Sequence, residues 1–230
     1  MDAWINDPSS TNKASTRDFK LSGLRSFFDF LIYQGWSTRN PTRMVSVKFN
    51  LLTHAQKVVK DKEVFTEDEF ALVAASFEGF FRDAAIISYE VGLRLGDICN
   101  LEFVCFNLPL KMVTVVTDKA DTRVDIPITR RVVGMVKRLR IQESGPYLFP
   151  KWREIQNDPK RRGTIPTMFK RKFVALGFED RSFHCLRKTY ATNSYRAAMR
   201  GQLNQEALNL VSKNLGHGST TPTKTYISIQ

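Results

Sequence analysis

The sequence predicts a mainly α-helical protein with one small antiparallel β-sheet, an α+β fold divided into two unequal domains. Three observations lead to this expectation. Apolar residues recur with a period near 3.6 in residues 15–36 and in several segments after residue 65. Between residues 103 and 128 the period changes to two, as in half-buried strands. Residues 46–64 show no period and carry many charges, which is typical of a linker.

The first domain, residues 1–45, is expected to be a partial helical domain. Phe19, Leu24 and Phe28 recur near the helical period within residues 15–36, and basic residues occupy the polar side. An Asn-Pro pair then breaks the helix. This part of the chain therefore supplies one long amphipathic helix ahead of the linker.

The second domain, residues 65–230, begins with a capping box, because Thr66 is followed three positions later by Glu69. Gly92 is expected to end the apolar helix before it in a left-handed conformation. Two alternating strands with a turn at residues 118–121 predict a hairpin. Further helices are expected at residues 129–140, 165–175, 182–199 and 204–215, and after Pro222.

The charge of the chain is the first indication of function. The 35 Lys and Arg residues exceed the 23 Asp and Glu residues, which gives a net charge of +12. A balance this basic favours a polyanionic partner, because each cation placed against a phosphate releases a condensed counterion. The alternative is a basic surface that only keeps the protein soluble. We expect a nucleic acid as partner.

Cysteine and histidine usage indicates an intracellular protein without a bound metal. The three cysteines form no C-x-x-C pair, and three histidines are too few for a zinc cluster. No apolar run is long enough for a membrane span, and the N-terminus lacks the apolar stretch of a secretion signal. We therefore expect a cytoplasmic protein with reduced thiols and no cofactor.

Polar residues at the ends of the expected elements are candidates for a functional site. Arg94 follows the Gly92 cap where a new helical turn begins, and Asp97 lies three residues further on. The same spacing fits a simple surface ion pair. Lys119 lies in the hairpin turn, where lysines are commonly solvated but can also reach a neighbouring site and donate a proton.

The segment SFHCLRKTYAT is more informative. His184 and Arg187 are three residues apart and share a helix face, while Leu186 and Tyr190 point to the opposite one. We expect the apolar pair to pack on the core and the polar pair to line a site. A histidine buried at the start of a helix is the alternative, and it leaves the neighbouring arginine unexplained.

The last segment, LGHGSTTPTKTYISIQ, contains two more candidates. Gly216 is expected to cap the preceding helix, so that His217 emerges at a helix end. Thr221 and Pro222 have the form of an N-cap and a first helical residue, which puts Tyr226 about one turn into a final helix. Taken alone, Tyr226 could equally be a core aromatic residue.

Together these residues could carry out phosphoryl transfer. A tyrosine hydroxyl is a poor nucleophile at neutral pH and needs cationic neighbours or a base. Two guanidinium groups can hold the non-bridging oxygens of a phosphate and stabilise the charge of a pentavalent transition state. A lysine can protonate the leaving oxygen. This route requires no metal.

The sequence resembles the tyrosine recombinases, or phage-type integrases. The resemblance rests on GLRLGDI, TDKADTRVDIPI, HCLRKTYAT and LGHGSTTPTKTY, and it covers nearly all of residues 64–230. The order of the motifs matches the family, and the nine positions from His217 to Tyr226 are the family's usual separation. The segment before the linker is similar to the end of the family's core-binding domain, a DNA clamp.

The resemblance implies a role for each candidate. Arg94 and Arg187 would hold the scissile phosphate, and Lys119 would be the general acid at the 5′ leaving oxygen. Tyr226 would attack the phosphorus and form a 3′-phosphotyrosyl bond, which conserves the energy of the phosphodiester without ATP.

The remaining implied roles are supporting. His184 would assist proton transfer, His217 would donate a hydrogen bond to a non-bridging oxygen, and Asp97 would orient a neighbouring catalytic residue. The implied substrate is a double-stranded DNA recombination site within a mobile genetic element or chromosome. Self-association on DNA as a dimer or tetramer is also implied, starting from a protein that can be monomeric without DNA.

The sequence departs from the family pattern at three places. The helical domain before the linker is short, residues 195–207 are an expected insertion, and four residues follow Tyr226. We expect these departures to affect tetramer formation more than cleavage. Two alternatives remain: a topoisomerase-like relaxing enzyme, and a DNA-binding module of the same fold that does not cut.

Overall fold

The chain divides into two compact units, residues 1–60 and 61–230. The computed structural model describes residues 5–7, 14–47, 64–117, 122–199, 204–216, 219–224 and 227. Within these residues, no helix is both long enough and apolar enough to cross a membrane.

The N-terminal unit is built on one long helix, α2 (Ala14–Tyr33), where the sequence predicts a helix at residues 15–36. Its small core consists of Ile5, Leu21, Val45 and Val47. The Arg25 guanidinium donates to the backbone oxygen of Val45 at 2.8 Å and holds the returning chain against the helix. The chain therefore remains packed on α2 as far as Val47, the second residue of the expected linker.

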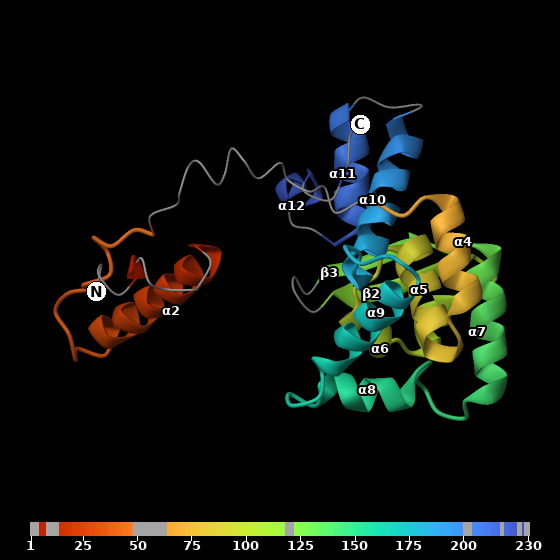
Figure 1. Ribbon diagram of the computed structural model, residues 1–230, viewed down its shortest axis with the longest axis horizontal. Coiled ribbons are helices and arrows are strands. Elements are labelled where there is room, and N and C mark those ends of the chain that lie inside the picture. The colour runs from red at the N-terminus through yellow and green to blue at the C-terminus, as the bar shows by residue number, and fades with distance from the viewer. Residues whose placement is uncertain are drawn as a thin grey trace. The chain divides into compact units, whose positions relative to one another are not determined.

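The C-terminal unit combines helices with one small sheet (Figure 1). This confirms the predicted α+β fold. Its first elements are α4 (Glu67–Ser76), α5 (Gly79–Val91), α6 (Leu95–Cys99), η1 (Phe103–Cys105), β1 (Phe106–Asn107), β2 (Met112–Thr117) and β3 (Thr122–Pro127). The later elements are α7 (Arg130–Gln142), α8 (Pro150–Asn157), α9 (Thr164–Ala175), α10 (Phe183–Met199), α11 (Asn204–Asn214) and α12 (Thr220–Lys224).

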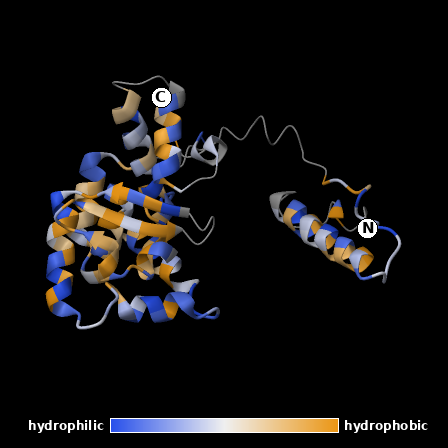
Figure 2. Ribbon diagram, turned by 180° about the vertical axis from the view of Figure 1, so that it is seen from behind, coloured by the Kyte–Doolittle hydropathy of each residue, from blue (hydrophilic) through white to orange (hydrophobic). Residues whose placement is uncertain are grey.

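The sheet has the strand order β1-β2-β3, and both pairs of strands are antiparallel. Val113, Val115, Val124 and Ile126 are buried, and polar or exposed residues alternate with them. Figure 2 shows this alternation as orange and blue bands along β3. The hairpin of β2 and β3 was expected, whereas β1 was not, because a strand of two residues is too short to produce a period.

Helix α10 lies at the centre of the C-terminal unit and packs against α5, α9 and α11. Beside it, the ring of Phe169 lies 4.5 Å from that of Phe183 and 6.3 Å from that of Phe173, measured between centroids. Phe169 and Phe173 of α9 are completely buried. Helix α8 was not predicted, because its eight residues are mostly polar. It begins with Pro150 and is held by Trp152, whose ring stacks on Phe80 with 4.3 Å between centroids.

The first described residues of the C-terminal unit are bonded to α10 and to the residues just before it. Arg181 donates to the backbone oxygen of Val64 at 2.6 Å and pairs with Glu69 at 3.2 Å. The backbone N–H of Phe65 donates to the buried Thr189 hydroxyl at 2.9 Å. The predicted capping box of Thr66 and Glu69 is confirmed. The start of the unit is thus fixed to its central helix.

The buried thiol of Cys99 should make the fold sensitive to alkali. Burial raises its pKa to about 12. The thiol stays protonated in the folded state, whereas in the unfolded chain it ionises at about pH 8.5. Its stabilising contribution is therefore present below that pH and is lost as the pH rises toward 12, by about 1.4 kcal/mol per pH unit.

We expect the free energy of unfolding of Cys99→Ala, measured by urea titration between about pH 8.5 and 10, to fall less steeply with pH than that of wild type. Cys105→Ala, which changes a partly exposed thiol, is the matched control. Parallel curves for wild type and Cys99→Ala would contradict the expectation.

Candidate active site

Arg94 is positioned by the end of one helix and the start of the next. Gly92 ends α5 with φ of 77°, as predicted, and Arg94 occupies the N-cap position of α6 in an extended conformation. Its Nη1 lies 3.9 Å from Oδ2 of the buried Asp97. Nη1 has no hydrogen-bond partner among the described residues. A half-buried cation with an unused donor is suited to bind an anion.

Arg187 is buried, with 2% of its surface exposed. Its Nη1 donates to the backbone oxygen of Gly92 at 2.6 Å, and its Nη2 donates to the backbone oxygen of Leu215 at 2.8 Å. We call these two hydrogen bonds the carbonyl clip. They join α10 to the turn before Arg94 and to the residue two positions before His217.

His184 is the second residue of α10 and is exposed. The first turn of this helix is fixed by the backbone N–H of Cys185, which donates to Ser182 at 2.9 Å. His184 therefore is not the buried core histidine of the alternative interpretation. Of the predicted pair, Arg187 is the buried member and His184 is open to solvent.

Lys119, His217 and Tyr226 lie outside the described residues. Their flanks are described. Thr117 pairs with Thr122 at the open end of β2 and β3, on either side of the segment with Lys119. Gly216 has φ of 62°, as expected for a helix cap.

Helix α12 leads toward Tyr226. It packs against α11 through the completely buried Thr223, and Ser212 of α11 donates to the backbone oxygen of Ser219 at 2.8 Å. The final helix begins at Thr220, two residues before the predicted start at Pro222. The short helix is therefore held in place by α11, the helix whose end is bonded to Arg187.

Three parts of the C-terminal unit that are far apart in the sequence lie on one side of it. Figures 1 and 2 agree that α12, the open end of β2 and β3, and the loop between α8 and α9 lie on the same side, with α7 on the other. The ends of elements far apart in the sequence thus lie on the same side of the unit.

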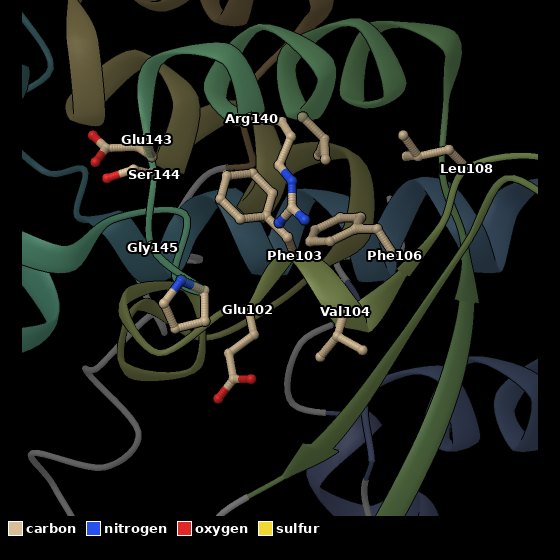
Figure 3. Close-up of a pocket in the computed structure, with 11 residues that line it drawn as sticks. Glu102, Phe103, Val104, Phe106, Leu108, Arg140, Glu143, Ser144 and Gly145 are labelled. Carbon is tan, nitrogen blue, oxygen red and sulfur yellow. The ribbon is translucent and has the colours of Figure 1, made fainter.

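A pocket of about 680 Å³ lies elsewhere, between η1, β1 and the end of α7 (Figure 3). In it the Arg140 guanidinium lies 4.7 Å from the centre of the Phe103 ring. Glu102 and Glu143 also line this pocket, and none of the predicted site residues that the structure describes does. The described candidate residues therefore lie outside this pocket.

The carbonyl clip should stabilise the protein even in the absence of any ligand. A lysine carries one nitrogen and cannot bond both carbonyls with the geometry of a guanidinium. We expect Arg187→Lys to lower the free energy of unfolding by about 2–4 kcal/mol, because it leaves a buried carbonyl unsatisfied. Chemical denaturation measures this loss. Arg171→Lys, at an exposed position of α9, is the control and should stay within about 0.5 kcal/mol of wild type.

Relatives of known name align with most of the chain. The chain is 28% identical over 229 residues to tyrosine recombinase XerC of Thermodesulfovibrio yellowstonii, covering 91% of this chain and 70% of the relative. It is 26% identical over 221 residues to a tyrosine recombinase of Thermosipho africanus, with the same two coverages.

Solved structures share the fold. A lambda integrase dimer bound to a COC′ core site superimposes with a TM-score of 0.69 at 20% identity, covering 98% of this chain and 77% of the other. The Tn1549 transposon integrase in complex with a circular intermediate DNA gives a TM-score of 0.68 at 16% identity, covering 95% and 76%. The sequence pattern of the Phage integrase family matches residues 67–230. The chain therefore belongs to the phage integrase family of tyrosine recombinases.

Proposed function

We propose that this protein cuts and rejoins DNA strands at a specific recombination site, with Tyr226 as the nucleophile. Arg94 and Arg187 bind the scissile phosphate, Lys119 is the general acid, and His184 and His217 assist. Asp97, 3.9 Å from Arg94, orients that arginine. The proposed reaction takes place on double-stranded DNA in the cytoplasm and involves self-association of the protein on that DNA.

One observation carries this proposal. The carbonyl clip bonds Arg187 to Gly92 and to Leu215, each of them two positions before another candidate of the set. Three motifs that are far apart in the sequence are therefore linked through one side chain. Arg94, the candidate two positions after Gly92, keeps a buried donor, Nη1, without a hydrogen-bond partner among the described residues. Such an arrangement suits a phosphate that enters from the exposed side.

The proposed chemistry balances without a cofactor. The Tyr226 oxygen attacks phosphorus and loses its proton to a base, and the bond from phosphorus to the 5′ oxygen breaks. Lys119 protonates that oxygen, so a free 5′ hydroxyl remains opposite a 3′-phosphotyrosyl ester. Attack by the 5′ hydroxyl of another strand reverses these steps and releases the tyrosine. The number of phosphodiester bonds is unchanged.

The face shared by α12, the hairpin end and the α8–α9 loop is the proposed DNA surface. The loop contains three consecutive exposed cations, Lys160, Arg161 and Arg162. Asn157, at the end of α8, donates to Asn100 at 3.1 Å, which joins this loop to the end of α6. The three cations therefore follow α8, a helix that packs against α6, which begins directly after Arg94.

A trapped covalent adduct tests the nucleophile. A duplex is first recovered by repeated selection of random-sequence DNA on the immobilised protein. It is then nicked just to the 3′ side of the cleavage position, so that the short fragment carrying the released 5′ hydroxyl diffuses away. Wild type should accumulate a protein–DNA adduct on this substrate that resists denaturing electrophoresis. Tyr226→Phe should form none, because it lacks the attacking oxygen.

The matched control is Tyr195→Phe, which removes the hydroxyl of a different tyrosine and should still form the adduct. Binding without any adduct would support the non-cleaving module. Relaxation of supercoiled DNA without joining of a second duplex would support the topoisomerase-like alternative.

Salt dependence tests the proposed DNA surface. The logarithm of the binding constant should fall linearly with the logarithm of the salt concentration, by about 0.9 per neutralised phosphate. The triple variant Lys160→Gln, Arg161→Gln, Arg162→Gln should bind more weakly and reduce the slope by about 1 for each phosphate that it no longer neutralises. Fluorescence anisotropy of labelled duplex at several salt concentrations measures both quantities.

The control variant removes three exposed cations of α7, on the other side of the unit: Arg130→Gln, Lys137→Gln and Arg140→Gln. It has the same net charge as the first variant and should keep the wild-type slope. Equal slopes for both variants would assign the effect to net charge alone and remove the support for this face.

A further inference from the structure

Tyr190 makes an unusually close contact with the backbone that precedes Arg94. A Cβ atom added to Gly92 would lie 2.2 Å from Cδ1 of Tyr190 and within 3 Å of two further ring atoms. The ring therefore lies on the bare Cα of a residue whose φ of +77° also favours glycine. This contact fixes the position of the turn relative to α10.

The other end of Tyr190 is bonded to the end of α11. Its hydroxyl is hydrogen-bonded to the side chains of Ser194 and Asn214. Asn214 is the last residue of α11, next to Leu215. Burial raises the pKa of Tyr190 above its usual range, against the effects of these hydrogen bonds and of the Arg187 charge. The hydroxyl thus stays neutral at ordinary pH.

Tyr190 and Arg187 form two parallel connections between the same segments. They are three residues apart, and each contacts Gly92 on one side and residue 214 or 215 on the other. The sequence-based expectation placed Tyr190 on the opposite face from Arg187. In the structure both side chains lie toward Gly92, because residues three positions apart share a helix face.

We propose that Tyr190 is a positioning residue for the strand-cleavage reaction. Its ring and hydroxyl set the distance between the turn that carries Arg94 and the helix end that leads to His217, so that both arginines meet one phosphate. This role rests on the proposed function. Because a misplacement of about 1 Å can cost on the order of a hundredfold in rate, even a small shift of this turn is measurable.

Tyr190→Phe tests the role, because it keeps the ring on Gly92 and removes only the hydroxyl that bonds Asn214. With the nicked duplex described above, we expect adduct formation at saturating protein to slow by on the order of tenfold. DNA affinity should stay within about twofold of wild type, because the ring and the surface cations are unchanged.

Tyr195→Phe is the matched control. Tyr195 is another buried tyrosine of α10, so it shows what the loss of a buried hydroxyl does by itself. We expect it to form the adduct at a rate within about twofold of wild type, even where its melting temperature falls as much as that of Tyr190→Phe.

A second substrate separates positioning from general weakening of the fold. A methylphosphonate at the cleavage position replaces one charged oxygen by a methyl group, so the placement of the two arginines matters less. The defect of Tyr190→Phe relative to wild type should shrink to about threefold or less on this substrate. A merely structural defect would be the same on both substrates.

The outcomes separate this role from the proposed function. No adduct with wild type would overturn the proposed function and this role with it. A normal wild-type adduct with Tyr190→Phe at the wild-type rate, or with an equal defect on both substrates, would overturn the positioning role alone. A slowed adduct that recovers on the methylphosphonate, with Tyr195→Phe unaffected, supports it.

Discussion

Arg187 donates to one carbonyl oxygen 95 residues before it in the chain and to another 28 residues after it. Burying a guanidinium is costly unless its donors find acceptors, and here Nη1 and Nη2 each donate to a backbone carbonyl oxygen. The same two bonds satisfy the carbonyls at a helix cap and a helix end, which have no partner within their helices. Position and stability at the candidate site therefore depend on one side chain.

Helix α10 extends this dependence to the rest of the C-terminal unit. Thr189, two residues after Arg187, accepts from Phe65 and donates to Cys185, while Arg181 before the helix holds Val64. The chain following residues 48–63 is therefore bonded within a few residues of the candidate site. A displacement of Val64 and Phe65 would therefore act on the helix that carries His184 and Arg187.

The sequence predicted the features that depend on local chemistry. The capping box at Thr66 and the left-handed Gly92 follow from residue type and spacing, and both are found. It did not reveal α8, whose stability comes from the stacking of Trp152 on a distant ring rather than from an apolar period. The part played by Tyr190 was also missed, because a helical-face argument uses spacing alone and cannot see the open Cα of a glycine 98 residues away.

The carbonyl clip also bears on how the protein responds to acidity. A guanidinium remains protonated at every pH at which proteins stay folded, and backbone carbonyls do not titrate. The clip therefore holds its segments in the same arrangement from mildly acidic to alkaline solution. A change of pH in the neutral range therefore leaves this frame unaltered.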